Sequence, residues 1–293
     1  MKIRNSLLAV VVLALCAAPS SAGPQPPAGW TDGYVVANGI RIHYWRTGGN
    51  KPPLLMAHGS SDDGLCWTNL AREFQDQYDI IMFDARGHGL SDPPSASDQP
   101  DVQVEDLAGL IKELKLGRPI LMGHSMGSSS VARFAAKYPD VARAVILEDP
   151  GLVRSATPAA GAATQTPEQR RVTILARNNT TEEELVAGCM KNSPKWGRSE
   201  CEFWAPSKRR HHPGTVANVP SGLPPVGELF PKITAPTLIL KADAQGDLRT
   251  QNEDIASRLP RGKIVHIEGA GHNVRRENKA QTIEVMKAFL SGT

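Results

Sequence analysis

Short apolar runs recur along the chain, and stretches with helical spacing separate them. The runs are PLLMAHG, YDIIMFDARG, PILMGHS, ARAVILEDP, PTLILKAD and KIVHIEGAGH. Continuous apolar runs of this length indicate strands buried on both faces, and the helical stretches between them provide the crossovers that parallel strands need. Ahead of them, YVVANGIRIHYWRTG predicts two strands joined by the turn Asn38-Gly39. The pattern therefore predicts an α/β fold with a mostly parallel, doubly wound sheet.

The interval 151–230 departs from this alternation. It opens with small residues, Pro and Thr, continues with the helical stretches EQRRVTILARN and TTEEELVAGCMK, and ends in the proline-rich TVANVPSGLPP. An insertion between two strands at the carboxyl edge of a parallel sheet lies above the place where α/β folds bind ligands. We therefore expect a helical lid at 151–230, inserted before the penultimate strand, between core segments 23–150 and 231–293.

The first residues have the pattern of an export signal. Lys2 and Arg4 precede the apolar run LLAVVVLALCAA, and small residues before Gly23 provide a cleavage site. The run is too short to span a bilayer, and Leu15 before Cys16 is a poor match to a lipoprotein signal. We expect 1–22 to be a signal peptide and the mature chain to be secreted or periplasmic.

The charge and the cysteine content limit which kinds of partner and cofactor the sequence predicts. The 33 Lys and Arg against 30 Asp and Glu leave a net charge of +3, which is too small to predict nucleic-acid binding. The sequence has no Cys-x-x-Cys and no His-Glu-x-x-His, so we expect no metal and no other cofactor. Cys189 and Cys201 could form a disulfide in an oxidising compartment, which would leave Cys66 as a buried free thiol. The oligomeric state stays open.

Ser125 stands between Gly123 and Gly127, where an apolar run meets an alanine-rich helical stretch. In a sharp strand-to-helix turn the serine backbone is strained, and a Cβ two residues to either side would meet neighbouring backbone. The hydroxyl then projects near helix N-terminal amides that have no acceptor inside the helix. These features predict a nucleophile.

Four motifs occur in order along the chain: His58-Gly59, DARGHGLS at 84–91, Gly123-His124-Ser125-Met126-Gly127, and Gly271-His272. Together they resemble the α/β-hydrolase superfamily, in its lid-bearing esterase, lactonase and C–C hydrolase branch. The resemblance covers nearly the whole mature chain except the lid. It implies the α/β-hydrolase fold and places the acid/base histidine at His272, whose neutral imidazole can accept the Ser125 proton.

The carboxylate that would orient His272 has several candidates. Asp243, in the loop after PTLILKAD, precedes His272 by a separation similar to the usual one in the superfamily, and we expect it to be the acid. The superfamily often reads Gly-x-x-Asp here, so Asp243 comes one position early. Asp149, at the end of the preceding strand, is the alternative acid, and Asp247 and Glu148 are further alternatives.

The resemblance also implies an oxyanion hole and a reaction. The backbone N–H groups of Ser60 and Met126 would hold the oxyanion. The expected reaction is hydrolysis of a carboxylic ester or lactone through an acyl-enzyme on Ser125. The alternatives are a C–C bond hydrolase or a peptidase, and in another class a non-enzymatic ligand-binding or signalling member. Relatives that open epoxides use an aspartate at the position of Ser125.

Aromatic and basic side chains in the lid bear on the substrate. Trp196 and Trp204 could wall an apolar pocket, and the basic run 208–210 could place positive charge at its mouth. We expect a small-molecule substrate with an apolar or aromatic body, and we consider an added negative group. Trp67 is expected to pack in the core.

Overall fold

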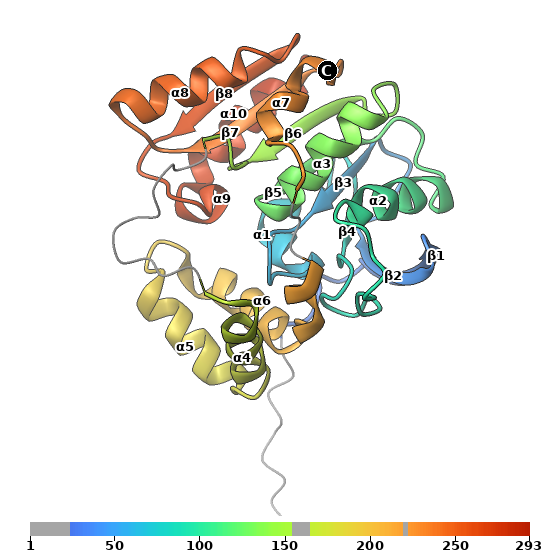
Figure 1. The fold of residues 1–293 in the computed structure, drawn as a ribbon, viewed down its shortest axis with the longest axis vertical. Coiled ribbons are helices and arrows are strands. Elements are labelled where there is room, and N and C mark those ends of the chain that lie inside the picture. Colours follow the sequence, from blue (N-terminus) through green and yellow to red (C-terminus); the bar gives the residue numbers. More distant parts are fainter. Residues whose placement is uncertain (1–23, 154–164, 219–221) are drawn as a thin grey trace, which may run out of the picture.

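The computed structural model describes residues 24–153, 165–218 and 222–293, so the expected signal peptide lies outside the described residues. Eight strands form one sheet in the order β1-β2-β4-β3-β5-β6-β7-β8 (Figure 1). The strands are β1 (Thr31–Ala37), β2 (Ile40–Arg46), β3 (Pro53–Ala57), β4 (Asp79–Phe83), β5 (Ile120–His124), β6 (Ala144–Glu148), β7 (Thr237–Ala242) and β8 (Gly262–Ile267).

The strand directions confirm the predicted sheet. β1 and β2 form the antiparallel hairpin, and Asn38 and Gly39 in its turn have φ of 46° and 77°, as a tight hairpin requires. β2 is antiparallel to β4, and every other neighbouring pair is parallel. The carboxyl ends of the parallel strands therefore meet at one edge of the sheet.

Helices cover both faces of the sheet. They are α1 (Thr68–Ala71), α2 (Val102–Glu113), α3 (Met126–Lys137), α4 (Pro167–Asn178), α5 (Glu182–Asn192), α6 (Gly197–Arg209), α7 (Val226–Leu229), α8 (Gly246–Ala256), α9 (Val274–Glu277) and α10 (Lys279–Leu290), with 3₁₀ helices η1 (Gly64–Trp67), η2 (Pro213–Asn218) and η3 (Phe230–Lys232). In the described ranges no helix has the length and apolar content needed to cross a membrane.

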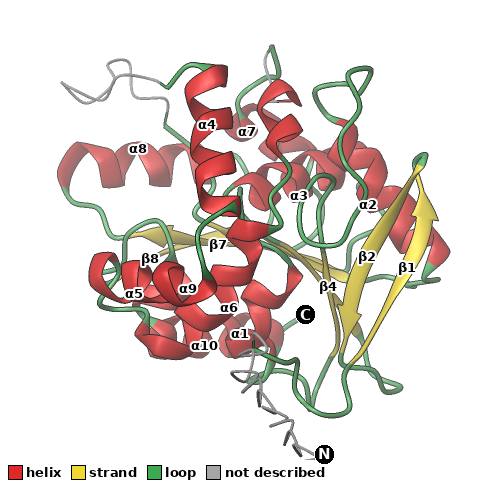
Figure 2. Ribbon diagram, turned by 90° about the horizontal axis from the view of Figure 1, so that it is seen from below, coloured by secondary structure: helices red, strands yellow, loops and turns green. Residues whose placement is uncertain are grey.

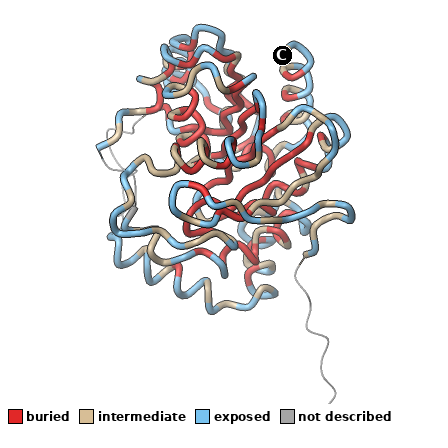
Figure 3. The backbone as a smooth tube through the Cα atoms, turned by 90° about the vertical axis from the view of Figure 1, so that its right-hand side faces the viewer, coloured by how far each residue is buried: buried red, intermediate tan, exposed pale blue. Residues whose placement is uncertain are grey.

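Side chains along β3 alternate between two cores. Leu55 and Ala57 pack beneath α2 and α3, while Leu54 and Met56 pack beneath α1 and α10. Figure 3 shows buried segments through the middle of the molecule and more exposed segments around them. Trp67 is fully buried in the second core, which confirms its predicted packing role.

The insertion before the penultimate strand is helical. α4 and α5 match the two predicted stretches, and each begins with a capping box, Thr166 with Gln169 and Thr181 with Glu184. α5 and α6 lie side by side (Figure 1, Figure 2). At the end of the interval, α7 instead packs on α3, because its apolar residues belong to the core beneath that helix.

The cysteines pair as the spacing allowed. Cys189 on α5 and Cys201 on α6 form a disulfide, so the two helices are joined covalently. Cys66 is a buried free thiol.

Candidate active site

Ser125 occupies the turn between β5 and α3 and has φ 51° and ψ −109°. Such a backbone is strained for a residue with a side chain, and it is held here by the Ser125 N–H, which donates to the Glu148 carbonyl at 3.0 Å. A Cβ on Gly123 would lie 2.3 Å from the Gly127 carbonyl oxygen, and one on Gly127 would lie 2.1 Å from that of Ala57. Both positions therefore need glycine, for the reason inferred from the sequence.

His272, in the loop between β8 and α9, joins Ser125 to a carboxylate. Its Nε2 lies 2.9 Å from Ser125 Oγ, and its Nδ1 lies 2.5 Å from Asp149 Oδ2. An ionised carboxylate only accepts hydrogen bonds, so Nδ1 carries the proton and Nε2 is free to accept the one on Ser125. The three side chains form a continuous hydrogen-bonded chain.

The charges in this chain stabilise each other. The hydrogen bond to Asp149 raises the pKa of His272, and burial opposes it. Burial alone would raise the pKa of Asp149, but the hydrogen bond from His272 and the charge of Lys241 outweigh it and lower that pKa. Lys241 Nζ also contacts the Asp149 carboxylate directly. Asp149 is therefore ionised at neutral pH.

The structure places Asp149 beside His272, so the prediction that Asp243 holds this position is wrong. Asp243 Oδ2 instead accepts the Gly269 N–H at 2.9 Å, and the Asp243 N–H donates to the Ala270 carbonyl at 2.7 Å. These bonds tie the end of β7 to the loop that leads to His272. Asp243 thus supports that loop without contacting the imidazole.

The strand register explains why Asp149, and not Asp243, contacts His272. His124 pairs with Glu148 on β6, and Glu148 pairs with Leu240 on β7. Asp149 therefore lies one strand from Ser125 and level with it, whereas Asp243 is two strands away and three residues past Leu240. The aspartate that directly follows the strand in AVILEDP is the signal that could have identified it.

The two further alternatives have other surroundings. The Glu148 carboxylate is fully buried and accepts from the Arg275 backbone N–H at 2.9 Å and from its guanidinium at 2.8 Å. Asp247 is exposed in the first turn of α8. Neither is bonded to His272.

A cavity of about 840 Å³ opens at Ser125 and His272, and Ser60 and Met126 also line it. Met126 begins α3, so its amide has no acceptor inside the helix. Ser60 follows Gly59, where a Cβ would lie 2.4 Å from Nδ1 of His124. Both amides are thus carried by tightly packed turns beside Ser125, as an oxyanion hole requires.

The other histidines of the cavity wall are held neutral. Burial, together with the charge of Lys208, lowers the pKa of His211 to about 4. Burial and the neighbouring His58 lower the pKa of His88 well below its usual value. The rings of His88 and His211 stack with centroids 4.5 Å apart. In the described part of the wall, His272 is the histidine whose pKa is raised.

Trp196 and Trp204, in the insertion, do not line the cavity, which corrects their expected role in substrate binding. The rings of Trp196 and Trp204 pack edge to face at 6.4 Å. The Arg276 guanidinium carbon lies 4.5 Å from the centroid of Trp196, and Lys208 Nζ lies 4.7 Å from that of Trp204. Trp196 thus contacts Arg276 on α9, and Trp204 contacts Lys208 one turn further along α6. As far as the described residues show, no Phe, Tyr or Trp lines the cavity.

The side chains of the basic run 208–210 form ion pairs outside the cavity. Lys208 is 1% exposed and donates to the Ser61 carbonyl at 2.6 Å and to Asp62 at 2.7 Å. Arg209 and Arg210 lie within 4 Å of acidic side chains outside the cavity wall. Other positive side chains line the cavity instead, on α3 and α4. Sequence reasoning missed them, although the helical spacing of EQRRVTILARN carries the signal.

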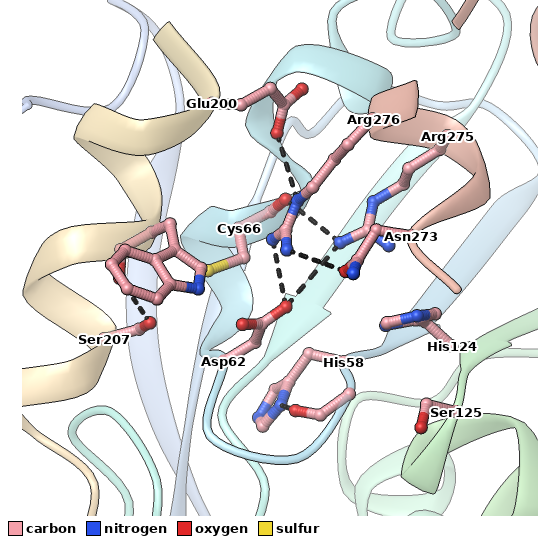
Figure 4. Close-up of polar contacts among 12 residues, drawn as sticks. His58, Asp62, Cys66, His124, Ser125, Glu200, Ser207, Asn273, Arg275 and Arg276 are labelled. Carbon is pink, nitrogen blue, oxygen red and sulfur yellow. Dashed lines mark hydrogen bonds and ion pairs between the residues drawn. The ribbon is translucent and has the colours of Figure 1, made fainter. Parts of the chain in front are cut away.

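Buried charges connect three segments around the site (Figure 4). Asp62 lies 2.9 Å from Arg276 and 3.8 Å from Arg275, both on α9, and 2.7 Å from Lys208 on α6. Glu200 contacts Arg276 at 3.3 Å from the other side. Burial would raise the pKa of Asp62, but Arg276, Lys208 and Arg275 outweigh it and hold that pKa well below its usual range. The Ser60 loop, the segment after His272 and the insertion thus share one ionised carboxylate.

No set of three or more His, Cys, Asp and Glu side chains is arranged to hold a metal ion within the ranges that the structure describes. The site brings together a serine hydroxyl, an imidazole, a carboxylate and two backbone amides, an arrangement that suits nucleophilic attack on a carbonyl.

Comparison with curated proteins finds relatives that are named as hydrolases. The 2-(acetamidomethylene)succinate hydrolase of Mesorhizobium japonicum is 38% identical over 104 residues, which are 36% of this chain and 37% of that protein. Epoxide hydrolase 1 of Caenorhabditis elegans is 24% identical over 298 residues, covering 92% of this chain and 72% of that protein. The match to the Mesorhizobium protein thus spans little more than a third of its length.

Solved structures share the fold. The N-formylmaleamic acid deformylase of Pseudomonas putida S16 superposes with a TM-score of 0.72 at 23% identity, covering 87% of this chain and all of that one. A model described as the alpha/beta hydrolase family matches residues 54–285, well over half of the chain. With the sheet order and the helical insertion seen above, the chain belongs to the alpha/beta hydrolase family.

Proposed function

We propose that the protein is an exported serine hydrolase that cleaves a carboxylic ester or lactone through an acyl-enzyme on Ser125. The observation that carries this proposal is the hydrogen-bonded chain from Ser125 Oγ through His272 to Asp149. It replaces Asp243 with Asp149 as the acid. Trp196 and Trp204 do not line the cavity, but apolar side chains such as Ile174, Val216 and Leu223 do, so an apolar substrate body stays part of the proposal.

The reaction follows from the roles of these groups. Ser125 Oγ attacks the substrate carbonyl while His272 Nε2 takes its proton, and Asp149 stabilises the resulting imidazolium. The amides of Ser60 and Met126 receive the oxyanion. His272 then protonates the leaving oxygen, and in the second half it deprotonates the water that hydrolyses the acyl-enzyme.

Chemistry separates this proposal from epoxide opening, which is the activity that some relatives are named for. Attack of a serine hydroxyl on an epoxide would leave an ether, and an ether has no carbonyl for water to attack. Turnover would stop at that stage. Serine at position 125 therefore supports acyl transfer, while amide and C–C substrates remain the competing carbonyl compounds.

Export is part of the same proposal. The export-signal pattern at 1–22 supports it, and so does the disulfide between Cys189 and Cys201, because such bonds persist in oxidising compartments. Both features are independent of the active site.

A phosphonate reagent and a substrate panel test the reaction. The reagent should form an adduct on Ser125, and Ser125→Ala should lower kcat on p-nitrophenyl esters or lactones by about three to six orders of magnitude. The control is Ser129→Ala. Ser129 lies one helical turn further along α3 and lines the same cavity, so this variant should still be labelled at Ser125. An adduct on another residue, or no adduct, would contradict the assignment of Ser125 as the nucleophile. Cleavage of C–C substrates without cleavage of any ester or lactone would contradict the proposed substrate class.

A further inference from the structure

Three arginines line the active-site cavity without an ion-pair partner among the described residues. They are Arg133 on α3 and Arg170 and Arg177 on α4. Two other cations in the wall are already neutralised: Arg86 lies 2.7 Å from Asp106, and Lys241 contacts Asp149. The first three are therefore the positive charges that this wall leaves available.

The acidic side chains of the wall do not offset this charge. Asp149 is engaged by His272 and Lys241. Asp101 is close enough to Arg133 to raise its pKa, against the larger lowering caused by burial, but the two form no ion pair. The three arginines outnumber the one remaining acidic side chain of the described wall, Asp101, so the net charge of the wall is positive.

α4 presents its arginines through helical periodicity. Arg170, Thr173, Ile174 and Arg177 follow the spacing that places residues on one helix face, and all four line the cavity. Arg171, the next residue after Arg170, is exposed and does not line it. The helix therefore offers a matched pair of arginines, one facing the cavity and one facing away.

Arg170 contributes a buried donor to this wall. Its Nε has no hydrogen-bond partner among the described residues. Buried donors are almost always satisfied, and a charged one is costly to leave without an acceptor. Because the Arg170 side chain lines the cavity, an anion bound there would offset the cost of leaving this charge unpaired.

Arg133 lies away from the reacting carbonyl. Arg133 follows Ser125 by eight residues, which is about 12 Å along α3, and its Nη2 is fixed by the Pro224 carbonyl at 2.7 Å. Arg177 adds to the positive charge around His211, whose pKa is lowered first by burial and then by Lys208. The position of Arg133 suits a second group of the substrate and leaves the oxyanion to the amides of Ser60 and Met126.

We propose that Arg133, Arg170 and Arg177 bind a carboxylate carried by the substrate, so that the ester or lactone cleaved at Ser125 is anionic. Guanidinium groups bind carboxylates through paired, charge-assisted hydrogen bonds. The inference rests on the proposed function, because the arginines and Ser125 share one cavity. The positive charge that the sequence analysis assigned to the basic run 208–210 is here assigned to Arg133, Arg170 and Arg177, because the run forms ion pairs outside the cavity.

Two esters of equal acyl length test the proposal: mono-p-nitrophenyl adipate, which carries a carboxylate, and p-nitrophenyl hexanoate, which does not. In Arg170→Gln and Arg177→Gln, kcat/KM for the adipate ester should fall about ten- to a hundredfold, as expected when a hydrogen bond to a charged group is lost. The hexanoate ester should change less than about twofold. Arg171→Gln should leave both values unchanged, and added salt should reduce the adipate preference of the unmodified protein. Equal losses on both esters, or none, would overturn the proposal.

A binding measurement separates this proposal from the reaction itself. Calorimetry with adipate on the Ser125→Ala variant should give a Kd that Arg170→Gln weakens about tenfold or more and Arg171→Gln leaves unchanged. Labelling of Ser125 without adipate binding or preference would reject the carboxylate site and keep the serine hydrolase. Adipate binding that depends on Arg170, in a protein whose Ser125 is not labelled, would keep the site and reject the proposed reaction.

Discussion

Asp149 contacts Nδ1 of His272, and that contact governs both the orientation of the imidazole and its pKa. Asp149→Asn should therefore lower kcat by about three to four orders of magnitude, because an amide neither stabilises the imidazolium nor enforces the tautomer. Asp243→Asn should lower kcat by about tenfold or less, because the Asp243 side chain only accepts the Gly269 N–H in the loop before His272. Steady-state kinetics of both variants in one assay decide between them. A larger loss in Asp243→Asn would contradict the observed geometry.

The pH profile tests the same contact. The hydrogen bond to Asp149 raises the pKa of His272 above its ordinary 6.5. Because the base must be unprotonated, kcat/KM should fall as the pH drops through this raised pKa, with a midpoint above 6.5. In Asp149→Asn the imidazolium loses its stabilising partner, so the midpoint of the residual activity should move to lower pH. A midpoint that stays in place would mean that another group sets the pKa.

Among the elements, α6 and α9 meet at the buried carboxylate of Asp62. Asp62→Asn leaves Lys208, Arg276 and Arg275 without this counter-charge, and should lower the free energy of unfolding by about 3–5 kcal/mol. Glu202→Gln is the control, since its pair with Arg198 is exposed and should contribute less than about 1 kcal/mol. Urea unfolding at pH 7 measures both.

The pH dependence of that stability has a defined sign. The pKa of Asp62 is held well below its usual range in the folded state. Its contribution is therefore present above the ordinary value of about 3.9 and is lost as the pH falls toward the lower folded pKa. The difference between Asp62→Asn and the unmodified protein should be largest near neutral pH and shrink in acid. A difference that is constant down to strong acid would assign the effect to packing.

At the scale of the whole molecule, export and the disulfide make one joint prediction. If residues 1–22 are removed on export, the mature chain begins at Gly23 and has lost Cys16. With Cys189 and Cys201 bonded, alkylation of the denatured exported protein should modify Cys66 and no other cysteine. Intact-mass measurement counts the modified thiols, and a second modified thiol at Cys16 would show that the leader is retained.

Local patterns in the sequence determined much of this protein. The apolar runs predicted the parallel strands, helical spacing predicted α4 and α5, and the glycines around Ser125 predicted the strained turn. The strands, helices and turn depend on residues near each other in the chain, so periodicity and turn chemistry are enough to find them. His272 was instead identified through the resemblance to the α/β-hydrolase superfamily.

Tertiary structure decided the partners of those features. Asp149 and Asp243 both follow strands that end at the same sheet edge, and only the register of β5, β6 and β7 places Asp149 level with Ser125. Trp196 packs on Arg276 of α9 and so does not line the cavity, and the rotation of α4 places Arg170 in the cavity wall. Such contacts join side chains far apart in sequence, and their geometry depends on strand order and helix rotation, which the local pattern does not contain.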